Sequence, residues 1–280
     1  MSVAKSDRVV VIGAGPVGLC LSLALAQDEI PVTLVETLGD DNFLEQVPRA
    51  GTNHPATLEM FDRIGLYEKI EPRGIIAPVF HYWDRHENRL IAAFDHIHLK
   101  DDTDFPYVLQ CERIKIVEEA LKMAKAHPLI DLRLRTTFRS FEQDADRVIA
   151  RVTNPAGEEE VIEGRYIVSG EGARSIIRKD LGIDFEGFTY SDRTLLIAIF
   201  RGEADDDVLD RYERQRRHVA IKHRQADTIR NKRLLAEKDS AVRQKNNDQL
   251  RRTSEDPQLA RAFLPPSSLI ESIREADQIQ

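Results

Sequence analysis

The amino-acid sequence predicts an α/β fold, with a parallel sheet near the N-terminus and a helical segment at the C-terminus. A valine-rich run, a glycine-rich turn and an apolar helical stretch follow one another over residues 8–27. Alternating apolar and polar residues at 132–134 and 148–152, with a turn at 154–157, indicate a β-meander. No glycine occurs after Gly202, where helical spacing dominates. With 41% apolar and 31% charged residues, the 280-residue chain has the composition of a folded globular protein.

The first strand, turn and helix form a unit with a specific fingerprint. Arg8–Ile12 is short and rich in valine, which is typical of a buried parallel strand. The pattern Gly13-x-Gly15-x-x-Gly18 follows at once, and Val17–Gln27 is predicted to be a helix. Val32–Val35 is predicted to be a second buried strand, with Glu36 at its end. This order of elements, with an acidic residue after the second strand, indicates a Rossmann-like dinucleotide-binding unit.

Each residue type in this fingerprint has a physical role. Gly13 permits a tight turn, Gly15 lets a pyrophosphate approach the backbone, and Gly18 lets the helix pack close to the strand. The helix N-terminus offers N–H groups and a partial positive charge to phosphates. Glu36 would accept hydrogen bonds from ribose hydroxyls and repel a 2′-phosphate, which disfavours NADP in this pocket. The candidate binding residues of this unit are Gly13, Ala14, Gly15, Pro16, Val17, Gly18, Glu36 and Thr37.

The apolar start of the chain has two other interpretations, a secretion signal and a membrane span. Glycines and Pro16 interrupt the run after a few residues, whereas a membrane helix needs about 20 uninterrupted apolar residues. We therefore expect no membrane partner. Two cysteines, Cys20 and Cys111, allow no disulfide framework and favour a reducing, cytoplasmic location. The net charge of −8 argues against a general nucleic-acid binder.

The segment after Glu36 contains motifs that resemble a known family. Residues 48–51 read Pro-Arg-Ala-Gly and residues 54–59 read His-Pro-Ala-Thr-Leu-Glu, before a predicted helix that ends near Leu66. These motifs resemble the single-component FAD-dependent aromatic hydroxylases, the class A flavoprotein monooxygenases. The resemblance implies that the bound dinucleotide is FAD. It also implies that the loop residues Arg49, Ala50 and Gly51 contact the flavin.

Two further positions take their roles from the same resemblance. Gln110 precedes a predicted helix whose core stripe is Ile114, Val117, Leu121 and Ala124. In the family a glutamine here hydrogen-bonds the ribityl or phosphate region of FAD, and the backbone near Phe138 meets the adenine. Cys111, beside the glutamine, is interpreted as a packed thiol rather than a nucleophile.

A second glycine-rich turn follows the predicted buried strand Tyr166–Val168. Residues 169–175 read Ser-Gly-Glu-Gly-Ala-Arg-Ser and resemble the family's second fingerprint, Gly-Ala-Asp-Gly-Ala-x-Ser. The family's aspartate lies near the FAD pyrophosphate and supports the use of NAD(P)H. The acid here is Glu171, one methylene longer, and it joins Gly170 and Gly172 as a candidate FAD contact. The alternative is a plain turn before a helix at 175–181.

The family's third FAD motif, Gly-Asp-Ala-Ala-His-x-x-x-Pro, has no copy in this sequence. The family's second sheet, which forms the aromatic pocket over the flavin, should follow residues 189–200. Instead the chain continues into residues that resemble helices near the far end of the family. We therefore expect a shortened or engineered flavoprotein, with a junction near Phe200–Gly202. The predicted domains are a FAD-binding domain at 1–200 and a helical C-terminal segment at 201–280 that packs on it.

The C-terminal segment has a helical stripe at Tyr212, Val219 and Ala226, within a mostly basic stretch. Such a stretch could bind nucleic-acid phosphates, but a solvated helix packed on an acidic domain is favoured. Pro265-Pro266 predicts a break before a final helix that Ser267 or Ser268 would cap.

Other candidate sites are weaker. His96 and His98 would share a face if they lay on a strand, but no further metal ligands are evident, so we expect no metal site. Tyr82 and Trp83 are expected in the core or in a pocket wall. No Gly-x-Ser-x-Gly elbow is present, which argues against hydrolase chemistry.

Three functions remain open from the sequence. The first is a minimal FAD-binding flavoprotein that would oxidise NAD(P)H without efficient hydroxylation, because the flavin lacks its covering sheet. The second is a complete hydroxylase that uses FAD, NAD(P)H as external reductant, O₂ and a small aromatic substrate, with a pocket built otherwise, for example by oligomerisation. The third is a non-catalytic nucleotide-binding or interaction module. In the first two, the flavin supplies the chemistry and no catalytic residue of the protein is assigned.

Overall fold

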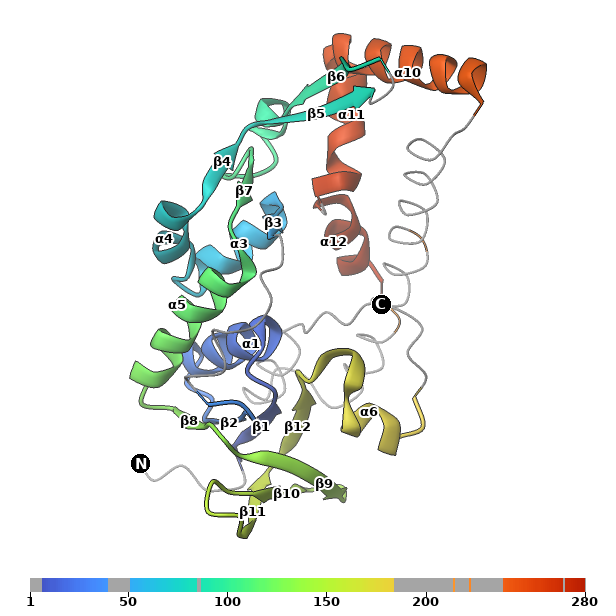
Figure 1. Cartoon of the computed structure of the whole chain (residues 1–280). Coiled ribbons are helices and arrows are strands. Elements are labelled where there is room, and N and C mark those ends of the chain that lie inside the picture. Colours follow the sequence, from blue (N-terminus) through green and yellow to red (C-terminus); the bar gives the residue numbers. More distant parts are fainter. Residues whose placement is uncertain are drawn as a thin grey trace. The chain divides into compact units, whose positions relative to one another are not determined.

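A computed structural model describes residues 7–39, 51–84, 87–183, 239–268 and 270–279, together with the isolated residues 214 and 222. The chain forms two compact units, each built from separate stretches of sequence (Figure 1). The first comprises residues 1–50, 64–70 and 112–209, and the second comprises 51–63, 71–111 and 210–280. The domain boundary expected at residue 200 and the stripe at 212–226 lie outside the described residues, and both stay predictions.

The first unit is built on a four-stranded parallel sheet with the order β12-β1-β2-β8 (Figure 1). Its strands are β1 (Val9–Ile12), β2 (Val32–Val35), β8 (Ile130–Arg133) and β12 (Tyr166–Ser169). β1 and β2 are buried throughout, which confirms the two strands expected from their apolar runs. Leu132, expected in the meander, lies instead in β8, because this segment pairs in parallel with β2.

Helices cover one face of this sheet, and the meander packs on the other. Helix α1 (Pro16–Gln27) packs against α5 (Arg113–Ala126), and short α4 (Tyr67–Ile70) also contacts α5. In α5, Ile116 and Ala120 join three of the expected stripe residues in the core, while Ile114 is only half-buried. Alternation along β1 directs Val11 toward α1 and Val10 toward the meander.

The meander contains β9 (Thr137–Gln143), β10 (Val148–Thr153) and β11 (Glu159–Gly164), in the order β11-β10-β9. The predicted turn at 154–157 is confirmed, with Gly157 at φ +85° and the Asn154 side chain accepting hydrogen bonds from backbone N–H groups. Beyond β12, a 3₁₀ turn η4 (Gly172–Arg174) leads into α6 (Ile176–Asp180). Ile177 of α6 joins the core formed with β1, β9 and β10.

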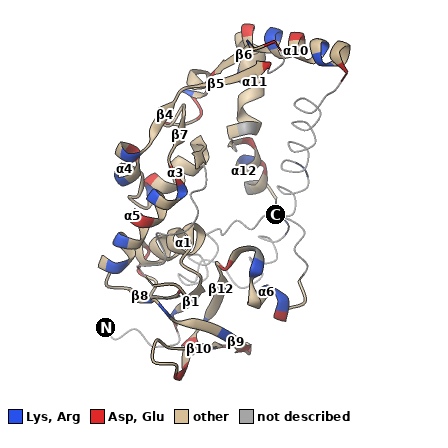
Figure 2. Cartoon of the chain, viewed as in Figure 1, with Lys and Arg blue, Asp and Glu red and all other residues tan. Residues whose placement is uncertain are grey.

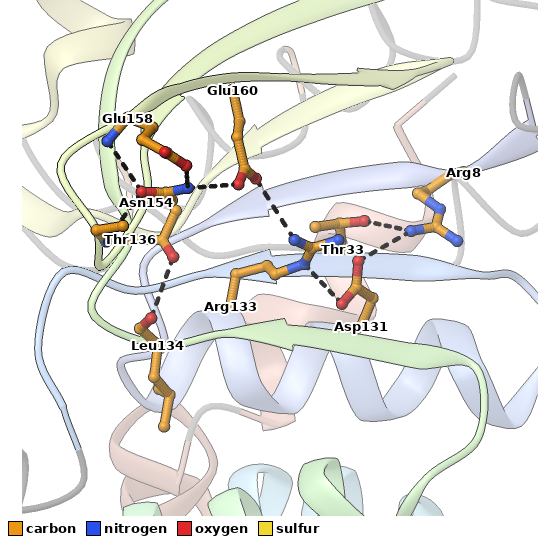
Figure 3. A network of polar contacts seen from close by, with 10 residues as sticks. Arg8, Thr33, Asp131, Arg133, Leu134, Thr136, Asn154, Glu158 and Glu160 are labelled. Carbon is orange, nitrogen blue, oxygen red and sulfur yellow. Dashed lines mark hydrogen bonds and ion pairs between the residues drawn. The ribbon is translucent and has the colours of Figure 1, made fainter.

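A polar network ties the parallel sheet to the meander (Figure 3). Arg8 donates to Thr33 Oγ1 at 2.7 Å and to Asp131 at 3.3 Å, and Arg133 donates to Asp131 at 2.8 Å. Arg133 also lies 3.6 Å from Glu160 of the meander. The hydrogen bond to Asp131 raises the pKa of the Arg133 guanidinium above its usual value. These side chains are partly exposed, so each ion pair contributes little alone, and the network mainly sets register.

The second unit contains two small antiparallel sheets. One has the order β3-β7-β4 and is made from β3 (Thr52–Asn53), β7 (Val108–Gln110) and β4 (Ile75–Ala77). The other is the bulged hairpin of β5 (Val79–Asp84) and β6 (Arg89–Asp95). Helix α3 (Pro55–Arg63) and the 3₁₀ turns η2 (Glu71–Arg73) and η3 (His96–Leu99) complete this part.

The C-terminal helices pack on the hairpin. They are α10 (Ser240–Glu255), α11 (Pro257–Ser268) and α12 (Ile270–Asp277), and α10 contacts β6 while α11 contacts η3. Phe94 of β6 stacks on Phe263 of α11 with ring centroids 4.3 Å apart. Buried Asn247 of α10 donates to the buried Asp84 carboxylate at 2.7 Å. Figure 2 shows basic and acidic residues along α10.

Two predictions for this unit are wrong, the helix break at Pro265-Pro266 and the burial of Trp83. Pro265 and Pro266 do not end their helix, since α11 continues to Ser268, whose hydroxyl donates to the Pro265 carbonyl in the last turn. The buried Leu264 anchors this turn against the hairpin core. Trp83 is 56% exposed, because alternation along β5 places it on the face opposite Tyr82, and only Tyr82 packs against the hairpin core.

The two histidines considered as metal ligands do not lie on a strand. His96 and His98 lie in η3 rather than on a strand, and His96 is buried with Nδ1 2.9 Å from the Pro78 carbonyl oxygen. Within the described ranges, no group of three His, Cys, Asp or Glu side chains could hold a metal ion.

Cys20 and Cys111 are buried, and burial raises the pKa of the Cys20 thiol to about 12. No helix among the described residues is long and apolar enough to cross a bilayer.

Candidate dinucleotide-binding site

The predicted glycine-rich turn lies in the first unit, between the end of β1 and the start of α1. Gly15 is the N-cap of α1 in an extended conformation, and Pro16 is the first helical residue. No side chain among the described residues caps this helix, so the N–H groups of Val17 and Gly18 have no capping acceptor. An uncapped helix N-terminus behind a glycine turn has the donors that an anionic phosphate group requires.

The protein packing around the turn explains two of its glycines. Gly13 has φ +98°, and a Cβ there would lie 2.8 Å from the carbonyl group of Gly170. A Cβ on Gly18 would lie 1.9 Å from the Gly13 carbonyl oxygen, so only glycine allows α1 to approach the turn. For a Cβ on Gly15, the nearest atom among the described residues beyond its chain neighbours would be the Gly170 carbonyl oxygen, 3.9 Å away. Gly15 therefore borders open space, which is the arrangement that fits a pyrophosphate group.

The carboxylate of Glu36 reaches the same turn. Its Oε2 accepts a hydrogen bond from the Ala14 backbone N–H at 2.8 Å, and its Oε1 accepts one from the Leu38 N–H at 2.9 Å. A carboxylate has about four lone-pair sites, so two remain for ribose hydroxyls. Thr37, the next residue, is exposed. The structure thus brings Glu36 to the turn, as the fingerprint requires.

The second glycine-rich turn lies directly behind the first. The Gly170 N–H donates to the Ile12 carbonyl at 2.6 Å, and the Glu171 backbone N would be 3.0 Å from a Cβ on Gly13. The Glu171 side chain, however, turns toward α6. It accepts hydrogen bonds from the hydroxyls of Ser169 and Ser175 at 3.1 and 2.8 Å. The backbone of Gly170–Gly172 is thus beside the first turn, while the acid of this motif is engaged by the protein.

Sequence reasoning did not assign a role to the two serines. Ser175 is the N-cap of α6 and its Oγ accepts from the Arg178 N–H at 3.0 Å. Ser169 lies at the end of β12, with its Oγ 2.7 Å from Ser175 Oγ. A serine just before a predicted helix is a capping signal that can be recognised in the sequence. No sequence pattern indicated the contact between the serines and Glu171.

The remaining predicted residues are spread over both units. Phe138 lies at the start of β9 and is buried in the core beneath the meander. Its neighbour Thr136 donates its backbone N–H to the Glu36 carbonyl at 2.9 Å, which joins this segment to the Glu36 end of β2. In the second unit, Gln110 pairs with Thr52, whose hydroxyl donates to Gln110 Oε1 at 3.0 Å.

Gly51 lies beside this pair, since its carbonyl accepts the Cys111 N–H at 2.9 Å. The structure therefore brings Gly51 and Gln110 together, and their contact with a flavin stays a prediction. The Gln110 side chain is exposed, and its hydrogen bond within the described part of the chain is the one from Thr52. Arg49 and Ala50, the other flavin-side candidates, lie outside the described residues.

Comparison with known proteins identifies relatives of the chain. A family model described as "FAD binding domain" matches residues 7–196. Para-nitrophenol 4-monooxygenase of Pseudomonas sp. (strain WBC-3) is 31% identical over 195 residues, covering 69% of this chain and 47% of that protein. The 6-hydroxy-3-succinoylpyridine 3-monooxygenase HspB of Pseudomonas putida (strain DSM 28022 / S16) is 26% identical, covering 67% and 47%. The chain thus spans about half the length of these curated relatives.

Solved structures give the same picture of the fold. The p-nitrophenol 4-monooxygenase PnpA of Pseudomonas putida DLL-E4 superposes with a TM-score of 0.85 at 20% identity, covering 97% of this chain and 98% of that one. The anhydrotetracycline hydroxylase OxyS of Streptomyces rimosus has a TM-score of 0.53 at 30% identity, covering 65% of this chain and 35% of its own.

Proposed function

Because the chain belongs to the FAD-binding domain family, with class A flavin-dependent aromatic monooxygenases as its relatives, we propose that the turn Gly13–Gly18 binds the ADP half of FAD. One observation carries this proposal. The open side of Gly15, the uncapped N-terminus of α1 and the Glu36 carboxylate meet at the end of β1. Together they offer N–H donors to the phosphates and a carboxylate to the ribose.

The electrostatics of this site favour FAD over a 2′-phosphorylated nucleotide. Glu36 holds the Ala14 and Leu38 N–H groups and keeps acceptor capacity for ribose hydroxyls. A 2′-phosphate would bring a second anion against this carboxylate, which costs free energy at short range. NADPH is therefore disfavoured as the resident of this turn, and the family resemblance assigns NAD(P)H the role of external electron donor.

We assign the flavin-side and adenine-side contacts from the family resemblance. Arg49, Ala50, Gly51 and Gln110 would contact the flavin half, and the Gly170–Gly172 backbone would border the pyrophosphate. The backbone near Phe138 would meet the adenine, supported by the Thr136–Glu36 hydrogen bond that places this segment beside the ribose-binding acid.

The activity that fits these features is NAD(P)H-dependent redox chemistry with a small hydroxylated aromatic compound as substrate class. The flavin supplies electron transfer and oxygen activation when bound, so the chain's residues need only bind, orient and shield it. The third FAD motif of the family has no copy in this sequence. We therefore expect loose shielding from water, with NAD(P)H oxidation that yields mainly H₂O₂.

The test begins with purified full-length chain, which should turn yellow and retain about one FAD per chain after desalting. Protein that stays colourless and takes up no added FAD would disprove the proposal. NADH and NADPH oxidation is then measured with phenolic substrates, together with H₂O₂ and hydroxylated product. Product formed in step with NAD(P)H consumed would instead establish a coupled hydroxylase.

A further inference from the structure

Glu171 occupies an unusual position for the acid of a cofactor fingerprint, because its carboxylate is consumed by the protein itself. Oε1 accepts the Ile176 N–H at 3.1 Å, and Oε2 accepts the Ile177 N–H at 3.4 Å. Ser175 Oγ accepts the Arg178 N–H at 3.0 Å. The three N–H groups of the first turn of α6 therefore all have acceptors, and α6 keeps none of them for a ligand.

The two serines close this arrangement into a network. Ser175 Oγ donates to Glu171 Oε2 at 2.8 Å, and Ser169 Oγ lies within hydrogen-bonding distance of both Glu171 and Ser175. Ser175 is buried, and Glu171 is half-buried. The extra methylene of glutamate lets one carboxylate span the end of β12 and the start of α6. The network therefore fixes the backbone between these elements.

That backbone forms the rear wall of the proposed FAD turn. Gly170 donates its N–H to the Ile12 carbonyl at 2.6 Å, and its own carbonyl lies against Gly13. A Cβ on Gly13 would approach both Gly170 and Glu171 N within 3.0 Å. Because the two turns touch through backbone atoms, a shift of Gly170–Glu171 displaces Gly13 with it.

We infer that Glu171 is a positioning residue of the FAD site, which acts by capping α6 and so holds the Gly170–Glu171 backbone behind the turn Gly13–Gly18. This inference rests on the proposed binding of FAD at that turn. The side chain of Glu171 does not touch the cofactor in this arrangement. Ser175 is its partner, and the effect reaches the ligand only through the shape of the first turn.

The experiment compares Glu171→Ala, Ser175→Ala and the double variant in the full chain, with FAD and ADP titrated against each. Each single variant should weaken FAD binding about tenfold, as expected for lost hydrogen bonds to a charged group. ADP should weaken by the same factor, since its pyrophosphate is the part of FAD that the turn Gly13–Gly18 would bind. The double variant should lose little more than either single one, because the two side chains act as a unit. Glu255→Ala, on the exposed end of α10, is the control and should bind FAD and ADP like the wild type.

Amide hydrogen exchange in the apoprotein gives a second readout that needs no ligand. Exchange over residues 12–19 should accelerate in Glu171→Ala and Ser175→Ala but not in Glu255→Ala. Weakened FAD binding with unchanged ADP binding would overturn the inference, because it would show that Glu171 acts on the flavin half. Unchanged exchange over residues 12–19 would also overturn it.

The inference can still be tested if one variant does not fold or if the proposed function fails. If Glu171→Ala does not fold, Ser175→Ala and the isosteric Glu171→Gln carry the same comparison. If the wild type binds neither FAD nor ADP, the proposed function fails, and the exchange experiment alone decides whether Glu171 positions the turn.

Discussion

The Glu36 carboxylate accepts a hydrogen bond from the backbone N–H of Ala14 over 2.8 Å, across the end of the parallel sheet. This contact joins the acid that follows β2 to the second residue of the glycine-rich turn. One side chain therefore shapes the turn and, in the proposed function, would also present oxygen atoms to a ribose. Substitution of Glu36 therefore affects both the shape of the turn and the proposed contact with a ribose. A comparison of ADP with its 2′-phosphorylated form isolates the contact with the ribose.

Replacement of Glu36 by Ala should weaken FAD binding about 10- to 100-fold, since hydrogen bonds to a charged group contribute about 1.5–3 kcal/mol. The variant should also discriminate less between ADP and its 2′-phosphorylated form, because the repelling charge is gone. Titration of both nucleotides, with Glu159→Ala on the meander as control, measures these effects. Equal discrimination in the wild type and Glu36→Ala would contradict the assignment of Glu36 to the ribose.

Gly15 and Gly18 offer a matched pair in one turn. Gly18→Ala should destabilise the fold by about 3 kcal/mol or more, because its Cβ would lie 1.9 Å from the Gly13 carbonyl oxygen. Gly15→Ala has an allowed backbone conformation and open space, so the apoprotein should unfold like the wild type. Its methyl group would occupy the place of the pyrophosphate and weaken FAD binding. Urea unfolding and FAD titration test the pair, and a stable Gly18→Ala would show that the turn is arranged differently.

His96 should make stability depend on pH. Burial lowers the pKa of the His96 imidazole, despite the hydrogen bond to Pro78 and the charge of Asp95, which both raise it. Below about pH 6.5 the unfolded chain binds a proton that the folded state resists, so the unfolding free energy falls as the pH falls.

The variant His96→Asn keeps a donor for the Pro78 carbonyl but cannot be protonated. It should show a smaller loss of unfolding free energy between pH 7.5 and pH 5.5 than the wild type, measured by urea unfolding at each pH. An identical loss in both proteins would exclude His96 as the source.

The buried pair of Asp84 and Asn247 fastens α10 to the hairpin of β5 and β6. Asn247→Ala should lower the unfolding free energy by about 2 kcal/mol, because the Asp84 carboxylate loses a buried donor. Gln244→Ala, exposed on the same helix, is the control and should have almost no effect. Thermal or urea unfolding distinguishes them, and equal stability of both variants would show that water replaces the Asn247 amide.

Local patterns in the sequence were enough to predict much of the first unit. The glycine spacing at 13–18 and the acid at 36 depend on steric and electrostatic rules that apply wherever a βαβ unit binds a dinucleotide. The turn at 154–157 could be predicted because asparagine, proline and glycine each favour turn conformations. Leu132 was misassigned because a short alternating run does not reveal whether its partner is parallel or antiparallel.

Long-range packing accounts for what the sequence did not reveal. Trp83 is exposed because α11 packs on the other face of β5, where Tyr82 lies, and the continuation of α11 through Pro265 follows from its packing on the hairpin. The contact of Glu171 with Ser169 and Ser175 depends on how β12 and α6 meet, and no residue spacing encodes that angle. The second glycine-rich turn could therefore be recognised in the sequence, but the direction of the Glu171 side chain could not be predicted.

The contact between Gly13 and Gly170 also has a consequence for the order in which the molecule matures. These residues are separated by more than half of the chain, and β12 must join the sheet before the rear wall of the turn exists. A growing chain that has not yet reached Gly172 contains the whole glycine fingerprint but not the wall behind it. We therefore expect the turn to bind FAD only after the chain has been made as far as β12 and this strand has joined β1.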